Sequence, residues 1–554
     1  MMGWAMDCNR VTGTATPLFA RAMVLEDARG GRAVLATVEL QSVDLWMWQQ
    51  IVERLRVRDP RSGWGPHNVQ VSAIHTHSAP CGYSPYLLYN LSNPGFSEPL
   101  FEKAVEGTVG AILEAAARLE PAELSLDEAT IPRSEPVAFQ RSLDAYLRNR
   151  DVTRLDASQA DLALDRSMLV LRVRRPDGRP LGAMNWFGLH NTSVHADQTL
   201  LHHDNKGRAA LFHEEAARGD SPGFVSLFAQ ESAGDVTPNF RFSRERNRVI
   251  GRYDDDAASA DYVGRVQHEA VERGSERPGV PIAGAIDGVV RRVDLSSVWV
   301  APRFAGGRRD ARTGPPRYGL AMAQGTAEGP APMMAARPLT VALNHAARLR
   351  HTTRRALRLH DSHRDEVYGA QFPFLDLDGR HGEGGGTFGG RLPFSPGWLP
   401  PVDTTLRWAR RLRREGALEG MPWIPSVLPV QVIRIGPLAI ASLPLEPTTV
   451  SGRRIRGELL ATLRQHGVER VVCAGYANGY AGYVTTPEEF DVQNYEGAST
   501  CFGRETLGAV QTILDRCATA LAQPAGARQV EAGPALWHFS PALLRAHASP
   551  HARR

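Results

Sequence analysis

The chain has 554 residues, of which 42% are hydrophobic and 22% are charged. This balance is ordinary for a globular protein with a sizeable core, and it excludes an intrinsically disordered chain. A formal net charge of only +4 excludes the strongly basic surface that nucleic-acid binding usually requires.

The cysteines and the length of the apolar runs further limit the kind of protein that this sequence can encode. The five cysteines contain no Cys-x-x-Cys pair, so neither a disulfide framework nor a zinc site made of cysteines is supported. No apolar run approaches the roughly 20 residues that a membrane-spanning helix needs. The N-terminus as given lacks the basic and apolar segments of a secretory signal, and we therefore expect a cytoplasmic protein.

Apolar runs typical of strands alternate along the chain with amphipathic stretches typical of helices. In chain order we predict strand 32–40, helix 46–58, strand 68–77, helix 98–119, strands 167–174 and 181–190, helix 205–218, strand 223–229, helices 257–273, 341–359 and 403–415, strands 428–435 and 437–443, helix 450–466, strand 470–475 and helix 505–523. This interleaving predicts an α/β fold of layered mixed β-sheets flanked by helices.

The predicted elements all fall within residues 1–524, which we expect to form one domain. The remainder, 525–554, is too short for a second domain and is expected to be a docked tail. Within the domain, Gly306 to Pro338 is rich in Gly, Pro and Arg, which favours a surface loop that could act as a lid.

The first candidate for chemistry lies at the end of predicted strand 68–77. Side chains on a strand alternate between its two faces, so His75 and His77 are expected to share one face with the apolar residues before them. Two imidazoles at the end of a buried strand suit a zinc ion, because neutral imidazole nitrogen is a good zinc ligand. The alternative is a pair of hydrogen-bonded histidines without a metal.

Two further strand ends carry metal-ligand side chains. Strand 181–190 ends in His190, and Glu446 follows strand 437–443. Taken alone, His190 could be a structural histidine, and Glu446 could be an ordinary acid at the start of a helix. Catalytic zinc often combines histidines with a carboxylate and an open position for water, so the three strand ends together favour one shared site.

Several segments resemble, in the same order along the chain, those of the neutral, non-lysosomal ceramidases. They are His75–Ser78 (HTHS), Asp204–Gly207 (DNKG), Gly234–Asn239 (GDVTPN), Gly452–Arg456 (GRRIR) and Tyr483–Thr486 (YVTT), followed by Tyr495–Thr500 (YEGAST). The resemblance extends from Met1 to about residue 524. It implies the fold of that family's catalytic domain and zinc-dependent hydrolysis of the N-acyl bond of ceramide, to a fatty acid and a sphingoid base.

The resemblance also implies roles for individual residues. The ligands of one zinc ion would be His75, His190, Glu446 and Tyr483, and Tyr483 enters this set on the resemblance alone. His77 would handle protons or bind the substrate, with Arg141 and Tyr495 as substrate contacts. In the implied mechanism, zinc lowers the pKa of a bound water toward about 7, the resulting hydroxide attacks the amide carbonyl, and Tyr483 with a cation stabilises the oxyanion.

One departure from the family pattern concerns its serine, often named as a nucleophile, which is Thr237 here. Threonine keeps the hydroxyl, but its methyl group crowds the approach, so Thr237 either acts in place of serine or does not attack at all. The substrate could then be another N-acyl lipid or N-acyl amine.

A non-catalytic lipid-binding homologue is a further alternative, which the complete ligand set disfavours. The sequence as given also lacks the family's N-terminal signal and its immunoglobulin-like domain after the catalytic one. We therefore expect at most peripheral contact with a membrane.

Overall fold

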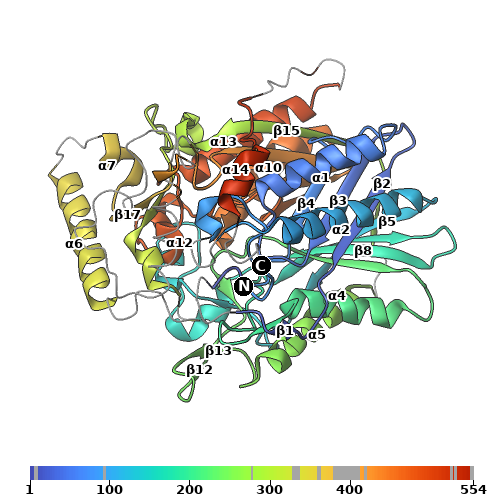
Figure 1. The fold of residues 1–554 in the computed structure, drawn as a ribbon, viewed down its shortest axis with the longest axis horizontal. Coiled ribbons are helices and arrows are strands. Elements are labelled where there is room, and N and C mark those ends of the chain that lie inside the picture. Colours follow the sequence, from blue (N-terminus) through green and yellow to red (C-terminus); the bar gives the residue numbers. More distant parts are fainter. Residues whose placement is uncertain are drawn as a thin grey trace.

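The computed structural model describes residues 1–4, 10–90, 95–275, 279–326, 328, 337–357, 363–378, 412, 414–416, 421–524, 528 and 533–548. Sheets form the interior of the molecule and helices cover them from outside (Figure 1). The predicted α/β class with mixed sheets is confirmed. The predicted helix at 403–415 lies almost entirely outside the described residues.

Three sheets dominate the fold, and each contains at least one parallel pair of strands. The first has the order β10 (Val225–Gln230), β8 (Pro180–Phe187), β7 (Ser167–Arg174), β5 (Glu123–Thr130) and β14 (Val280–Ile282). The second has the order β15 (Ile286–Asp294), β18 (Val427–Ile435), β19 (Leu438–Ser442) and β21 (Arg470–Ala474). The third has the order β2 (Ala20–Glu26), β3 (Arg32–Val38) and β4 (Val69–Ala73).

The inner faces of the three sheets share one hydrophobic core. Leu35 of β3, Trp186 of β8 and Ile440 of β19 belong to the same cluster, and each is at most 1% exposed. Burial of a side chain of this size contributes roughly 1.5–3 kcal/mol, so the shared core holds the sheets in a defined arrangement.

Each sheet is covered on its outer side by a pair of helices. The pairs are α1 (Leu45–Arg58) and α2 (Glu98–Ala117) on the third sheet, α4 (Asp204–Ala217) and α5 (Asp256–Ser275) on the first, and α10 (Thr449–Leu463) and α13 (Thr506–Leu521) on the second. All six correspond to helices predicted from the sequence. None of the described helices combines the length and the apolar character that a membrane-spanning segment requires.

Short elements complete the described fold. The two-stranded pairs are β1 (Gly13–Thr14) with β9 (Leu200–Leu201), β6 (Phe139–Gln140) with β11 (Val236–Thr237), β12 (Arg241–Ser243) with β13 (Arg248–Ile250), β16 (Arg317–Gly319) with β17 (Pro373–Asp376) and β20 (Glu446–Pro447) with β22 (Tyr483–Val484). The remaining α-helices are α3 (Leu143–Tyr146), α6 (Arg337–Ala356), α7 (His363–Tyr368), α11 (Pro487–Phe490), α12 (Tyr495–Ala498) and α14 (Pro541–His547).

The segment predicted as the surface loop Gly306 to Pro338 is partly regular. It contains β16 and a buried helical turn at Leu320–Gln324. Leu320 and Ala323 are at most 5% exposed, so burial of apolar side chains has overridden the local Gly and Pro content. The prediction of a continuous surface loop is therefore wrong for this part.

Residues 533–548, which follow α13, pack on the N-terminal part of the chain. The Phe539 ring lies edge-on to Trp46 and to Tyr86, with ring centroids 5.8 Å and 5.0 Å apart. The His547 carbonyl accepts a hydrogen bond of 2.8 Å from the Phe96 amide. These contacts hold α14 beside α1.

Candidate metal centre

The strands that lead to the candidate histidines end earlier than predicted. β4 ends at Ala73 and β8 ends at Phe187, so His75, His77 and His190 all lie in the loops that follow. His75 has a φ of +68°, a left-handed conformation that is uncommon outside glycine. The prediction that strand alternation places His75 and His77 on one face is wrong, because the backbone leaves the sheet before either residue.

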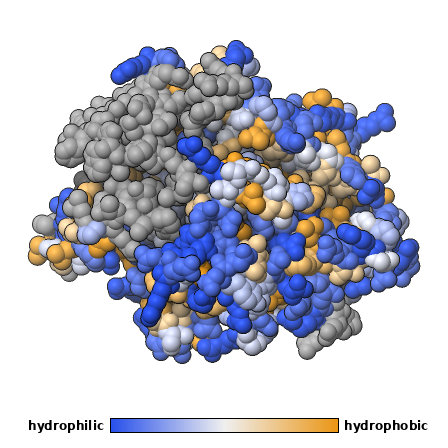
Figure 2. Space-filling view, turned by 60° about the horizontal axis from the view of Figure 1, so that its bottom comes forward, coloured by the Kyte–Doolittle hydropathy of each residue, from blue (hydrophilic) through white to orange (hydrophobic). Residues whose placement is uncertain are grey.

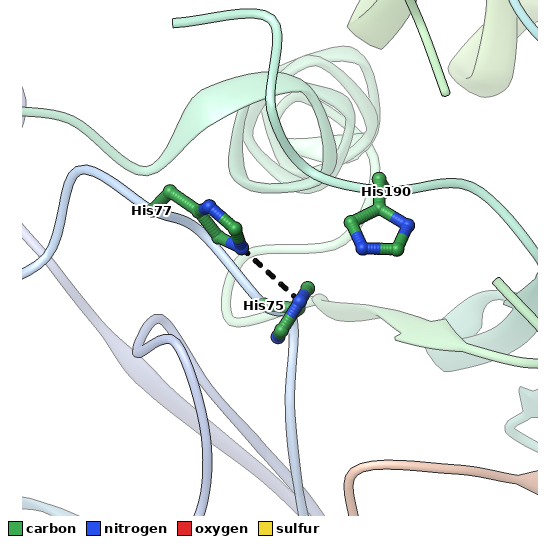
Figure 3. A group of neighbouring side chains, drawn as sticks. All are labelled: His75, His77 and His190. Atoms are coloured by element: carbon green, nitrogen blue, oxygen red, sulfur yellow. Dashed lines mark hydrogen bonds between the residues drawn. The ribbon is translucent and has the colours of Figure 1, made fainter. Parts of the chain in front are cut away.

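The three imidazoles nevertheless converge on one point (Figure 3). Ligand nitrogens of His75, His77 and His190 all lie within 4.8 Å of one another. The Nε2 atoms of His75 and His77 are 3.1 Å apart. His75 and His190 are each 1% exposed, whereas His77 is the least buried of the three.

Main-chain carbonyls orient the two most buried rings. The Nδ1 atom of His75 lies 2.6 Å from the Gln41 carbonyl oxygen, and Nδ1 of His190 lies 2.6 Å from the Ala233 carbonyl oxygen. A ring nitrogen that faces a carbonyl oxygen must carry the proton, so Nε2 of each ring presents its lone pair. This arrangement is the usual one for histidines that ligate a metal.

The Glu446 carboxylate faces both of these lone pairs. Its Oε1 is 3.5 Å from Nε2 of His75, its Oε2 is 3.6 Å from Nε2 of His190, and the side chain is 1% exposed. Ligands about 2.0–2.1 Å from a tetrahedral zinc would be about 3.4 Å apart. The spacing of these three side chains therefore fits a metal ion.

Protonated histidines do not provide the cation that the carboxylate requires. Burial lowers the pKa of His75 and, more strongly, the pKa of His190, because charging an imidazole away from water is costly. Two neutral nitrogens and a carboxylate then direct lone pairs into the same space, an arrangement that could hold a divalent cation.

Two tyrosines hold Glu446 in place. The Tyr476 hydroxyl donates to Oε2 over 3.2 Å, and the Tyr480 hydroxyl donates to Oε1. Sequence reasoning missed both residues. A signal was present, because the stretch 475–483 repeats the dipeptide Gly-Tyr, and the last repeat ends in Tyr483.

Tyr483 is brought beside Glu446 by strand pairing. β20 and β22 are parallel, with Glu446 directly opposite Tyr483. Burial is the main cause that raises the pKa of Tyr483 well above its usual value, and Glu446 adds to it. The described structure therefore places this phenol next to the carboxylate, while its role as a metal ligand stays a prediction.

Arg141 also contacts Tyr483. Its Nη2 donates to the Tyr483 oxygen over 3.1 Å, and its guanidinium lies 5.7 Å from the centre of the Tyr495 ring. The same guanidinium forms ion pairs with Glu496 at 2.8 Å and with Glu328 at 3.1 Å. Neither carboxylate was singled out from the sequence, although Glu496 lies within the YEGAST segment. Together they restrain Arg141 beside Tyr483.

Thr237 lies in the short β6–β11 strand pair, and its hydroxyl bonds a nearby main-chain amide. It is opposite Phe139 in the β6–β11 pair, and its hydroxyl accepts a hydrogen bond of 3.0 Å from the Asn239 amide. Among the contacts between described residues, the Thr237 hydroxyl makes no hydrogen bond to a histidine of the cluster. A catalytic role for Thr237 stays a prediction.

Comparison with known proteins assigns the chain to a family. Residues 1–358 and 412–512 match the family described as neutral/alkaline non-lysosomal ceramidase, N-terminal. The chain belongs to the neutral/alkaline non-lysosomal ceramidases. The predictions of this family and of a hydrolase are thereby confirmed.

Individual ceramidases cover nearly the whole chain. The neutral ceramidase of Pseudomonas aeruginosa is 31% identical over 526 residues, which cover 94% of this chain and 69% of the relative. Neutral ceramidase A of Dictyostelium discoideum is 30% identical over 544 residues, covering 92% and 69%. A solved structure described as a ceramidase complexed with C2 has a TM-score of 0.78 at 29% identity, covering 98% of this chain and 75% of the other.

The N-terminal residues of the chain lie against His77. The Trp4 ring is edge-on to His77 with centroids 5.1 Å apart, and its other side stacks on His195 at 5.8 Å. Gly3 has a φ of +113°, and a Cβ atom there would lie 2.5 Å from Cγ of His77. Gly3 therefore allows the main chain to approach the imidazole.

We predict that Gly3→Ala lowers kcat by about 10- to 100-fold while bound metal is retained, because the new methyl group displaces His77. Gly30→Ala is the matched control, since Gly30 also has a positive φ, +82°, but its Cβ would meet no atom within 4 Å. Steady-state kinetics and metal analysis of both variants test the prediction. Equal kcat values for the two variants would contradict it.

Lys206 anchors the strands behind His190. Its ammonium donates to the carbonyls of Phe187 and Ala229, at the ends of β8 and β10, over 2.9 Å and 3.2 Å. The side chain is fully buried, and burial lowers the pKa of Lys206 to about 7. The unfolded chain therefore binds this proton more tightly than the folded protein does between about pH 7 and pH 10.5.

This pKa difference predicts how stability depends on pH. As pH rises from about 7 to about 10.5, the contribution of Lys206 to the free energy of unfolding should increase by several kcal/mol, at most about 5. Lys206→Met removes the proton and should remove this increase, whereas substitution of the exposed Lys103 on α2 should not. Denaturant unfolding across this pH range measures the difference, and parallel profiles of wild type and Lys206→Met would refute it.

Proposed function

We propose that this protein hydrolyses the amide bond of ceramide with the help of a zinc ion held by His75, His190, Glu446 and Tyr483. The observation that carries the proposal is the convergence of two oriented Nε2 lone pairs on opposite oxygens of Glu446. The ligand types, their burial and their spacing suit zinc with an open position for substrate.

The substrate is inferred from relatives that span nearly the whole chain. Proteins named neutral ceramidase from a bacterium, a slime mould and Arabidopsis thaliana each align with at least 92% of it. The family match, over residues 1–358 and 412–512, includes all of the segments that carry the candidate ligands. Ceramide is therefore the first substrate to test.

A zinc ion in this position would supply Lewis acidity to the amide carbonyl and to water. The chain contributes restraint and proton transfer. Tyr476 and Tyr480 fix the Glu446 carboxylate, and Arg141 restrains the Tyr483 oxygen.

His77 is placed for proton transfer because its Nε2 lies 3.1 Å from the ligand His75. Burial lowers the pKa of His77 well below the usual value, so its imidazole is neutral. A neutral imidazole can accept a proton from water at its unprotonated ring nitrogen. It can then pass the proton to the leaving nitrogen, which must depart as an amine because an amide anion is a poor leaving group.

The test combines metal analysis with a substrate panel. The purified protein should contain about one zinc per chain and release fatty acid from ceramide, and a chelator should abolish this activity until zinc is restored. A folded, metal-replete sample that cleaves no ceramide of any acyl length would refute the proposal. Faster cleavage of another N-acyl amine would reassign the substrate and keep the chemistry.

A further inference from the structure

The β12–β13 hairpin carries an unusual combination of exposed aromatic and basic side chains. It projects from the lower edge of the molecule in Figure 1. Phe242 is 58% exposed and Tyr253, just after the hairpin, is 46% exposed. Figure 2 turns the lower side of the molecule toward the reader and shows a mainly hydrophilic surface with small, separate hydrophobic areas.

The first strand of the hairpin connects to the candidate active site. Phe240 and Phe242 lie on the same side of the chain because side chains alternate along a strand. The Phe240 ring stacks on Phe139 with centroids 4.5 Å apart. Phe139 is two residues before Arg141, which contacts Tyr483. Phe139 and Phe240 therefore connect the neighbourhood of Tyr483 with the exposed Phe242.

The second strand makes an independent connection. The Val249 carbonyl accepts a hydrogen bond of 3.2 Å from Nε2 of His195. His195 stacks on Trp4, and Trp4 contacts His77, the least buried histidine of the cluster. Each strand of the hairpin is thus linked, through intervening residues, to the candidate site.

The hairpin itself carries mostly positive charge, and the acidic run Asp254–Asp256 follows it directly. Residues 240–253 contain Glu245 and the basic residues Arg241, Arg244, Arg246, Arg248 and Arg252. Three of these arginines form ion pairs with Asp197, Asp254 or Asp256, which fix the hairpin to the body. Arg244 and Arg252 are exposed, and neither has an ion pair within the described part of the chain. Their guanidinium groups are suited to bind phosphate.

We propose that this hairpin contacts the surface of a lipid bilayer that contains anionic headgroups. Phe242 and Tyr253 enter the interface, where aromatic rings are favoured, and Arg244 and Arg252 bind lipid phosphates. The inference rests on the proposed function, because a ceramide substrate must be taken from a membrane. The hairpin then presents the active site at the surface where the substrate resides.

Vesicle flotation of the full-length, zinc-loaded protein tests the proposal. Phe242→Ser should weaken binding to vesicles of phosphatidylcholine and phosphatidylserine by about tenfold. Combined Arg244→Gln and Arg252→Gln should remove the preference for these vesicles over phosphatidylcholine alone. Trp299→Ser is the matched control, since Trp299 is an equally exposed aromatic residue, 56%, outside the hairpin, and it should bind like wild type.

Activity measurements separate the two proposals. On a dispersed short-chain ceramide, the hairpin variants should keep the wild-type kcat/KM, whereas on ceramide in vesicles they should lose activity in proportion to binding. If Phe242→Ser and the double arginine variant bind vesicles like wild type, the hairpin proposal is overturned and the proposed function stands. If wild type cleaves no ceramide but still binds vesicles through the hairpin, the proposed function fails and the hairpin proposal survives.

Discussion

Glu446→Gln is expected to abolish metal binding and to lower kcat/KM by at least about 1,000-fold. The substitution keeps the shape of the side chain but removes the negative charge that faces His75 and His190 at 3.5 Å and 3.6 Å. An amide nitrogen would in addition replace one of the two ligand oxygens. Metal content by mass spectrometry and steady-state kinetics measure both effects.

A second buried glutamate supplies the control. Glu489 is 3% exposed and accepts hydrogen bonds from Thr448 and Asn149. Burial raises the pKa of Glu489 to about 7, so its neutral form is accessible and glutamine is a close substitute. Glu489→Gln should therefore keep its metal. Retention of zinc by Glu446→Gln, at the wild-type level, would exclude Glu446 as a ligand.

His77→Ala is expected to lower kcat by about 100- to 10,000-fold while zinc remains bound, because general acid–base catalysis contributes rate enhancements of this size. Its Nε2 lies 3.1 Å from Nε2 of His75, close enough to belong either to the ligand set or to the proton-transfer group. Metal analysis of the variant separates these roles, and kinetics on the same sample give the loss in kcat.

A different result for His77→Ala would contradict its role in proton transfer. Loss of zinc from the variant would mean that the three imidazoles form the ligand set and that proton transfer is done elsewhere. His213→Gln is a suitable control, because His213 is also a buried histidine but bonds Ser226 and Glu272 away from the cluster. It should retain both zinc and activity.

The sequence by itself determined the fold class and most of the helices and strands. Apolar periodicity is a local property, and it located elements such as α1 at Leu45–Arg58 and β18 at Val427–Ile435 within one residue or so of their observed bounds. The candidate ligands His75, His190 and Glu446 were also found locally, as ligand-type side chains that follow apolar runs.

Tertiary structure alone decided how these residues become a site. It ends β4 at Ala73 and turns His75 into a left-handed conformation, which no strand pattern predicts. It supplies the Gln41 and Ala233 carbonyls that orient two imidazoles, from positions 34 and 43 residues away in the chain. Arg141 meets Glu496 across 355 residues. Hydrogen bonds between such distant residues leave no periodic trace in the sequence, because they depend on how whole sheets and loops pack together.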